Sequence, residues 1–133
     1  MSTFNSYQSG LHNVGSFQVS SIPYASASIE ISSTTVPYEV EFNRVSKFVV
    51  IKNSADALSA DAPLRFGFSE NGVKGSNYIR LLNEEEYEAD FKVTRLYLLA
   101  EESGGATASI SAGLTGIPAS QLTHNWSGSI GVG

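Results

Sequence analysis

The sequence predicts an all-β protein, an antiparallel sandwich or barrel of about eight strands with an extended segment at each end. Short runs rich in β-branched and aromatic residues recur roughly every ten residues. Several runs alternate apolar and polar residues, which is the pattern of a strand with one buried face. No Gly/Ser-rich linker divides the middle of the chain, so a single domain is expected for 133 residues.

The strands are predicted in order from these apolar patterns. The candidates span residues 16–24, 27–32, 37–42, 45–51, 64–68, 78–82, 87–93, 95–100 and 106–115. Alternation is clearest in residues 37–42, where Glu39 and Glu41 separate three apolar side chains. Residues 45–51 are denser in β-branched and aromatic side chains, which predicts a more buried strand. Pro23 interrupts the pattern of the first two candidate strands.

Turn signals set two expectations for the connections between strands. The run Glu-Glu-Ser-Gly-Gly at 101–105 predicts a turn, across which the strands at 95–100 and 106–115 would pair as a hairpin. Residues 67–75 are rich in glycine and contain Glu70-Asn71-Gly72, which indicates a loop.

One stretch could instead be helical. Residues 81–99 are rich in glutamate, and Leu81, Leu82, Glu85 and Ala89 partly fit the i, i+4 spacing of a helix. The apolar residues that follow fit a period of two better, so strands are favoured here.

Charge is confined to the middle of the chain. Of the 8 Lys and Arg and 13 Asp and Glu residues, all but Glu30 lie between Glu39 and Glu102. This pattern divides the chain into an N-terminal arm (1–13), a β-sandwich body (14–118) and a C-terminal arm (119–133). Uncharged ends can lie on another protein without desolvating an ion. The predicted partner-binding residues are their large apolar side chains: Phe4, Tyr7, Leu11, Leu122, Trp126 and Ile130.

Two alternatives stay open for the C-terminal arm, which holds the chain's single tryptophan. An exposed large apolar side chain such as Trp126 usually finds a partner, so the arm could dock on another protein. It could equally fold back over its own body.

Composition argues against several function classes. A net charge of −5 argues against nucleic acid, whose phosphates attract basic surfaces, and against an anionic membrane surface. No apolar run approaches the ~18 residues that span a bilayer, and the first residues show no signal-peptide pattern. The absence of cysteine excludes disulfides and thiolate metal sites.

The residues that could carry catalysis or bind metal are few. His12 and His124 lie one in each arm and lack a neighbouring carboxylate, which makes a poor ligand set. No serine stands in a nucleophile-elbow context. The acidic run at 84–90 would place several carboxylates on one face of a strand, a pattern typical of a solvated edge that repels strand pairing. We therefore expect no enzyme, no metal and no cofactor.

Four short stretches of the chain carry a recognisable pattern. They are NVGSFQVS at 13–20 followed by IPY at 22–24, VPY at 36–38 leading into 45–50, LRFGF at 64–68 and AGLTGI at 112–117. Together they resemble small virion structural proteins of tailed phages, particularly phages of marine bacteria. The second stretch departs from the pattern of these proteins, because residues 39–43 are additional positions between its two parts.

The resemblance implies a capsid decoration (cement) protein that stabilises the shell. Such proteins sit as β-sandwich or jelly-roll trimers on the outside of the capsid. The implied partners are the major capsid protein and two further copies of this chain, on a virion assembled in the host cytoplasm. Two alternatives stay open: a tail or fibre adaptor, and a virion glycan-binding module that uses loop aromatics such as Tyr78.

Overall fold

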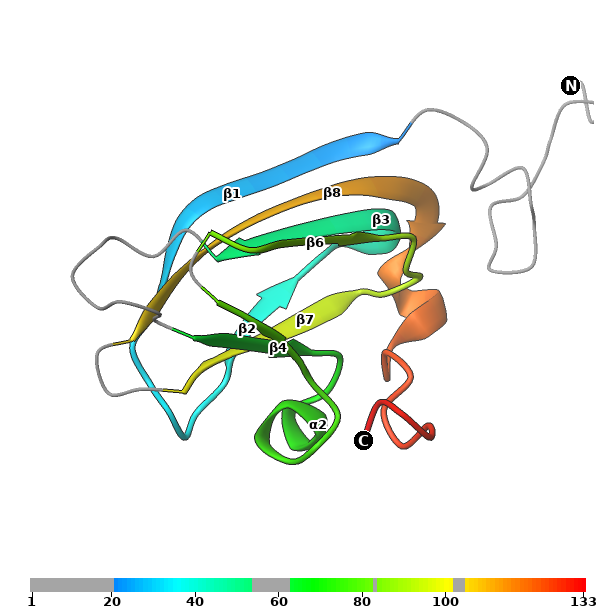
Figure 1. The fold of residues 1–133 in the computed structure, drawn as a ribbon. Coiled ribbons are helices and arrows are strands. Elements are labelled where there is room, and N and C mark those ends of the chain that lie inside the picture. The colour runs from blue at the N-terminus through cyan, green and yellow to red at the C-terminus, as the bar shows by residue number, and fades with distance from the viewer. Residues whose placement is uncertain (1–20, 54–62, 83, 102–104) are drawn as a thin grey trace, which may run out of the picture.

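Two four-stranded antiparallel sheets, packed face to face, make up the structure (Figure 1). The computed structural model describes residues 21–53, 63–82, 84–101 and 105–133. Its strands are β1 (Ile22–Ile31), β2 (Tyr38–Glu41), β3 (Arg44–Asn53), β4 (Leu64–Gly67), β5 (Ile79–Leu81), β6 (Glu86–Ala89), β7 (Arg95–Ala100) and β8 (Ala106–Pro118). The first sheet has the order β1-β8-β3-β6 and the second the order β2-β7-β4-β5. The all-β prediction is confirmed.

The strands are nested in pairs. β1 pairs with β8, β2 with β7, β3 with β6 and β4 with β5, each time antiparallel. The chain crosses from one sheet to the other at every connection except the one between β4 and β5. Such nesting results when one long antiparallel hairpin rolls up into two sheets, and it gives the eight-stranded jelly roll.

The predicted hairpin of β7 and β8 is wrong. β7 lies between β2 and β4 in the second sheet, whereas β8 lies between β1 and β3 in the first. The turn residues at 101–105 indicate a reversal of the chain, but they do not decide which sheet the next strand joins. That choice depends on pairing partners that are distant in the sequence.

β1 joins two predicted strands into one. It runs through Pro23, which is tolerated because β1 is an edge strand and has a neighbour on one side only. A register shift between Ser26 and Ile29 lies just after the gap between the two predicted strands, at the start of the second. Residues 16–20 of the first candidate lie outside the described residues.

A short helix, α2 (Glu70–Lys74), occupies the stretch predicted as a loop. The hydroxyl of Ser69 caps its N-terminus by accepting the amide hydrogen of Gly72 at 2.9 Å. Glu70 and Lys74 form an i, i+4 ion pair at 3.2 Å. The loop prediction is wrong because the cap and the ion pair offset the low helix propensity of glycine.

The stretch 81–99 forms strands, as favoured from its sequence. It contains the end of β5, all of β6 and most of β7. β6 is shorter than predicted and ends at Ala89. Phe91 and Val93 follow outside any strand, yet Val93 is buried in the core and Phe91 packs against it. Their burial accounts for the period-two pattern beyond the strand.

The main core lies between the two sheets. Its fully buried side chains include Phe42, Val49, Ile51, Leu64, Phe66, Leu96, Leu98 and Ile110. Phe66, Phe68, Tyr87 and Phe91 form a chain of ring contacts with centroid distances between 5.0 and 6.4 Å. Burying each large apolar side chain contributes about 1.5–3 kcal/mol, which makes this core the main stabilising feature of a chain without cysteine.

The outer faces of the two sheets differ. α2 lies against β4 and β7 of the second sheet, and the C-terminal segment runs from the end of β8 toward α2 (Figure 1). Val73 of α2 packs over Gly67 of β4. No described element covers the outer face of the first sheet. No helix among the described residues is long and apolar enough to cross a membrane.

Candidate functional site

The C-terminal segment folds back over the body, which is one of the two arrangements left open by its sequence. It begins with a 3-10 turn, η1 (Ala119–Leu122). Leu122 is only 2% exposed and packs with Val45 and Ile117 in a small cluster beside the main core. Residues 119–133 are thus packed on the sandwich rather than extended away from it.

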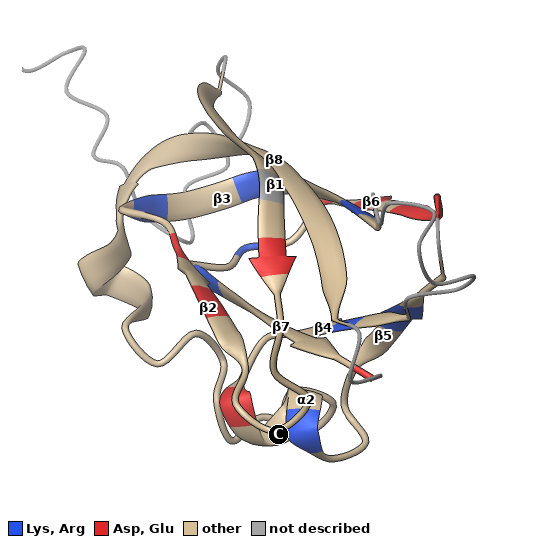
Figure 2. Ribbon diagram, turned by 90° about the vertical axis from the view of Figure 1, so that its left-hand side faces the viewer, with Lys and Arg blue, Asp and Glu red and all other residues tan. Residues whose placement is uncertain are grey.

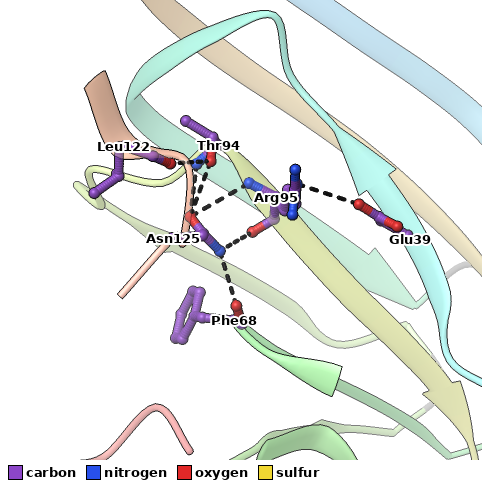
Figure 3. Close-up of polar contacts among 6 residues, drawn as sticks. All are labelled: Glu39, Phe68, Thr94, Arg95, Leu122 and Asn125. Carbon is purple, nitrogen blue, oxygen red and sulfur yellow. Dashed lines mark hydrogen bonds and ion pairs between the residues drawn. The ribbon is translucent and has the colours of Figure 1, made fainter. Parts of the chain in front are cut away.

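Asn125 holds this segment in place through its buried side chain (Figure 3). Its Oδ1 accepts the amide hydrogen of Thr94 at 2.7 Å, and its Nδ2 donates to the carbonyls of Phe68 and Arg95 at 2.8 and 2.9 Å. Thr94 Oγ1 donates to the carbonyl of Leu122 at 3.0 Å. Asn125 has a φ of 47°, a left-handed conformation that asparagine adopts more readily than most residues. The side-chain amide is therefore fully satisfied by protein groups.

The end of the segment contacts α2. Ser69 Oγ, which caps the helix, also donates to the carbonyl of Val132 at 2.9 Å. A Cβ atom at Gly72 would lie 2.0 Å from the same carbonyl oxygen, so only glycine permits this approach. The segment is thereby fixed at Leu122, at Asn125 and at Val132.

The predicted partner-binding residues differ in how far they are exposed to solvent. Leu122 is buried within its own chain and offers no surface to a partner. Trp126 is 37% exposed, and its indole nitrogen donates to the carbonyl of Lys92. Ile130 is fully exposed. The remaining three, Phe4, Tyr7 and Leu11, lie outside the described residues.

A polar pocket lies between the C-terminal segment and the outer face of the second sheet. Its volume is about 370 Å³. It is lined by Phe68, Ser69, Glu70, Asn71, Arg95, Tyr97, His124, Asn125 and Ser127, and is called here the tail pocket. These residues come from three stretches far apart in the sequence, and no motif in the sequence indicated that they would meet.

The outer face of the first sheet, which no described element covers and which is called here the bare face, is built mainly of small residues along β1 and β8 and carries charge along β3 and β6. A shallow, mainly apolar groove of about 250 Å³ runs along it. The groove is lined by small and apolar residues together with two charged ones: Ala25, Ser26, Ala27, Val50, Ser109, Ile110 and Ser111, with Lys52 and Glu86. β8, in the interior of the sheet, has no charged residue and is tan along its whole length in Figure 2. The sequence predicted an uncharged first arm and last arm, but not that an uncharged strand would face solvent.

The acidic run lies at the edge of this sheet, as predicted. β6 pairs with β3 alone, and its Glu86 and Glu88 are exposed. Glu84 and Asp90 flank the strand rather than belonging to it. Lys52 and Glu84 approach within 3.9 Å, too far and too exposed to neutralise the edge.

Two arginines share one carboxylate on the second sheet. Glu101, whose side chain is 12% exposed, accepts from Arg65 Nε at 2.7 Å and from Arg80 Nε at 2.8 Å. The guanidinium of Arg65 lies 4.2 Å from the centroid of the Tyr78 ring. Tyr78 therefore contacts Arg65 of this ion-pair cluster and does not line the tail pocket.

Among the described residues, no three His, Cys, Asp or Glu side chains gather where they could hold a metal ion. His12 lies outside these residues, and His124 stands at the rim of the tail pocket. Comparison of the chain with protein-family models, with curated proteins and with solved structures returned no match.

Proposed function

We propose that this chain is a non-enzymatic capsid decoration (cement) protein of a tailed phage, which binds the outside of the major capsid shell and stabilises it. The observation that carries the proposal is the bare face. The interior strand β8 carries no charged residue, so this part of the sheet surface loses little solvation when another protein covers it. The resemblance to virion structural proteins supports the proposal, as does the jelly roll, an architecture used by viral capsid domains.

The N-terminal segment joins the body at this same face. The side chains of Ser21 and Phe48 both lie over Gly113 of β8, where a Cβ atom would meet them at 2.5 and 2.3 Å. We propose that Phe4, Tyr7 and Leu11 extend the contact with the shell from this point. Assembly into a homotrimer would present three copies of the face and raise avidity without a tight individual contact.

The test measures binding of the full-length chain to purified shells that lack it. Ser111→Asp places a charge in the middle of the bare face, and the cost of desolvating it should lower affinity at least ~10-fold. Ser76→Asp makes the same change beside α2 on the opposite side of the molecule and should bind normally. Equal binding by both variants would refute the bare face as the contact.

Copy number on purified particles separates decoration from the tail or fibre adaptor. Quantitative mass spectrometry against the major capsid protein should find copies in proportion to shell subunits. A copy number that fits a single vertex would favour the tail or fibre adaptor instead, and absence of the chain from particles would refute both functions.

Deleting residues 119–133 is unsuitable as a test of shell binding, because the deletion removes Leu122 and Asn125 from the folded body.

A further inference from the structure

The tail pocket has the size of a small-molecule site. Its volume of about 370 Å³ lies within the range of roughly 300–1,000 Å³ usual for such sites. The floor is rigid, because Asn125 is held by hydrogen bonds to the backbone of Thr94, Arg95 and Phe68. The pocket is therefore preformed by the same contacts that hold the C-terminal segment.

Several polar groups in its wall remain available to a ligand. The side chains of Asn71, His124 and Ser127 form no hydrogen bonds with the described residues. Arg95 uses Nε to contact Glu39 at 3.3 Å, and its terminal nitrogens bond to no other described residue (Figure 3). An amide and a hydroxyl each donate and accept, so the wall offers both kinds of hydrogen-bonding group.

The charges of the wall balance. Arg95 is paired with Glu39, and Glu70 is paired with Lys74 at 3.2 Å. An anionic or cationic ligand would therefore meet no excess of opposite charge. A neutral ligand that carries many hydroxyl groups could use the donors and acceptors together.

Two aromatic residues, Phe68 and Tyr97, line the pocket, and the ring of Phe68 packs against Phe66 and Phe91. Tyr97 is half-buried and lines the pocket beside Arg95, and its cross-strand neighbour Gly67 is covered by Val73 of α2. The face of a tyrosine ring packs against apolar surface while its hydroxyl stays free to hydrogen-bond. A pyranose presents a C–H face to such a ring and hydroxyl groups to the polar residues around it.

We propose that the tail pocket binds a neutral sugar residue of a larger glycan. This differs from the expectation for a glycan-binding module based on Tyr78, since that ring is covered by Arg65. The proposal does not depend on capsid decoration, and either can fail without the other.

The test is heteronuclear NMR of the full-length, ¹⁵N-labelled chain titrated with glucose, galactose, mannose and N-acetylglucosamine, and with glucuronic acid as the charged probe. At least one neutral sugar should shift the amides of Asn71, Arg95 and Ser127 and saturate with a dissociation constant of ~1 mM, as its few atoms allow. Glucuronic acid should bind no more tightly. Absence of saturable shifts with every neutral sugar would overturn the proposal, as would a clear preference for the acid.

Variants locate the contact. Tyr97→Leu keeps an apolar side chain but removes the ring, and it should weaken sugar binding at least ~10-fold. The double variant Asn71→Ala/His124→Ala changes two exposed side chains and should have a similar effect if Tyr97→Leu does not fold. Tyr78→Ala removes a tyrosine outside the pocket and should bind sugar normally. Unchanged affinity in the first two variants would show that the sugar binds elsewhere.

Discussion

The side chain of Asn125 donates to the backbone carbonyl of Phe68 at 2.8 Å, although 57 positions separate the two residues. Phe68 directly follows β4, and the other bonds of Asn125 reach Thr94 and Arg95 at the start of β7. One side chain thus joins the C-terminal segment to two neighbouring strands of the second sheet. The segment is a structural part of the jelly roll, and it also forms one wall of the tail pocket.

Replacing Asn125 with alanine should destabilise the fold strongly. The change leaves the amide of Thr94 and the carbonyl of Phe68 without their partner, and each unsatisfied buried group costs about 1–3 kcal/mol. We expect the free energy of unfolding to fall by about 2–4 kcal/mol, measured by urea denaturation. Asn71→Ala is the control, because its side chain is exposed and should change stability by less than ~0.5 kcal/mol. Equal stability of the two variants would contradict the role given to Asn125.

Replacing Glu101 with glutamine should expose a repulsion between two arginines. Arg65 and Arg80 are direct cross-strand partners, and Glu101 bonds to both. Because Arg80 is half exposed, we expect a loss of only about 1–2 kcal/mol in unfolding free energy at low salt. Added sodium chloride should reduce this loss by screening the two arginines.

Thermal or urea unfolding at two salt concentrations checks this prediction. Glu88→Gln serves as the control, because Glu88 is exposed and forms no ion pair with the described residues. A loss for Glu101→Gln that does not change with salt would show that the carboxylate acts only as a hydrogen-bond acceptor.

The strands could be predicted from sequence wherever one face of the strand is buried and the other is exposed to solvent. Glu39 and Glu41 alternate with apolar residues in β2, and the acidic run of β6 indicated an edge before the sheet order was known. The nesting of β1 with β8 could not be predicted, because it joins residues such as Ile22 and Leu114 that are far apart in the chain. Local turn chemistry at 101–105 favoured the wrong partner for the same reason.

The candidate sites were harder to predict than the fold. Leu122 and Trp126 look alike in sequence as apolar residues in a glycine-rich tail, yet one is buried and the other partly exposed. Asn125, which holds the tail, could not be recognised from sequence either, because the burial of a polar residue requires partners that only the folded chain supplies. The bare face likewise arises from pairing, since an uncharged strand such as β8 is usually buried on both sides.

Removing charge from the β6 edge should make the protein self-associate. An open strand edge offers unpaired backbone groups, and acidic side chains oppose pairing with a second copy through repulsion. In the double variant Glu86→Thr/Glu88→Thr the β propensity is kept and the charge is lost. We expect folded protein that forms larger species as its concentration rises, measured by sedimentation velocity. Asp90→Thr removes a charge just beyond the strand and should stay at the wild-type oligomeric state, because no ladder position lies there. If the double variant sediments as the wild type does at every concentration, something other than charge protects this edge.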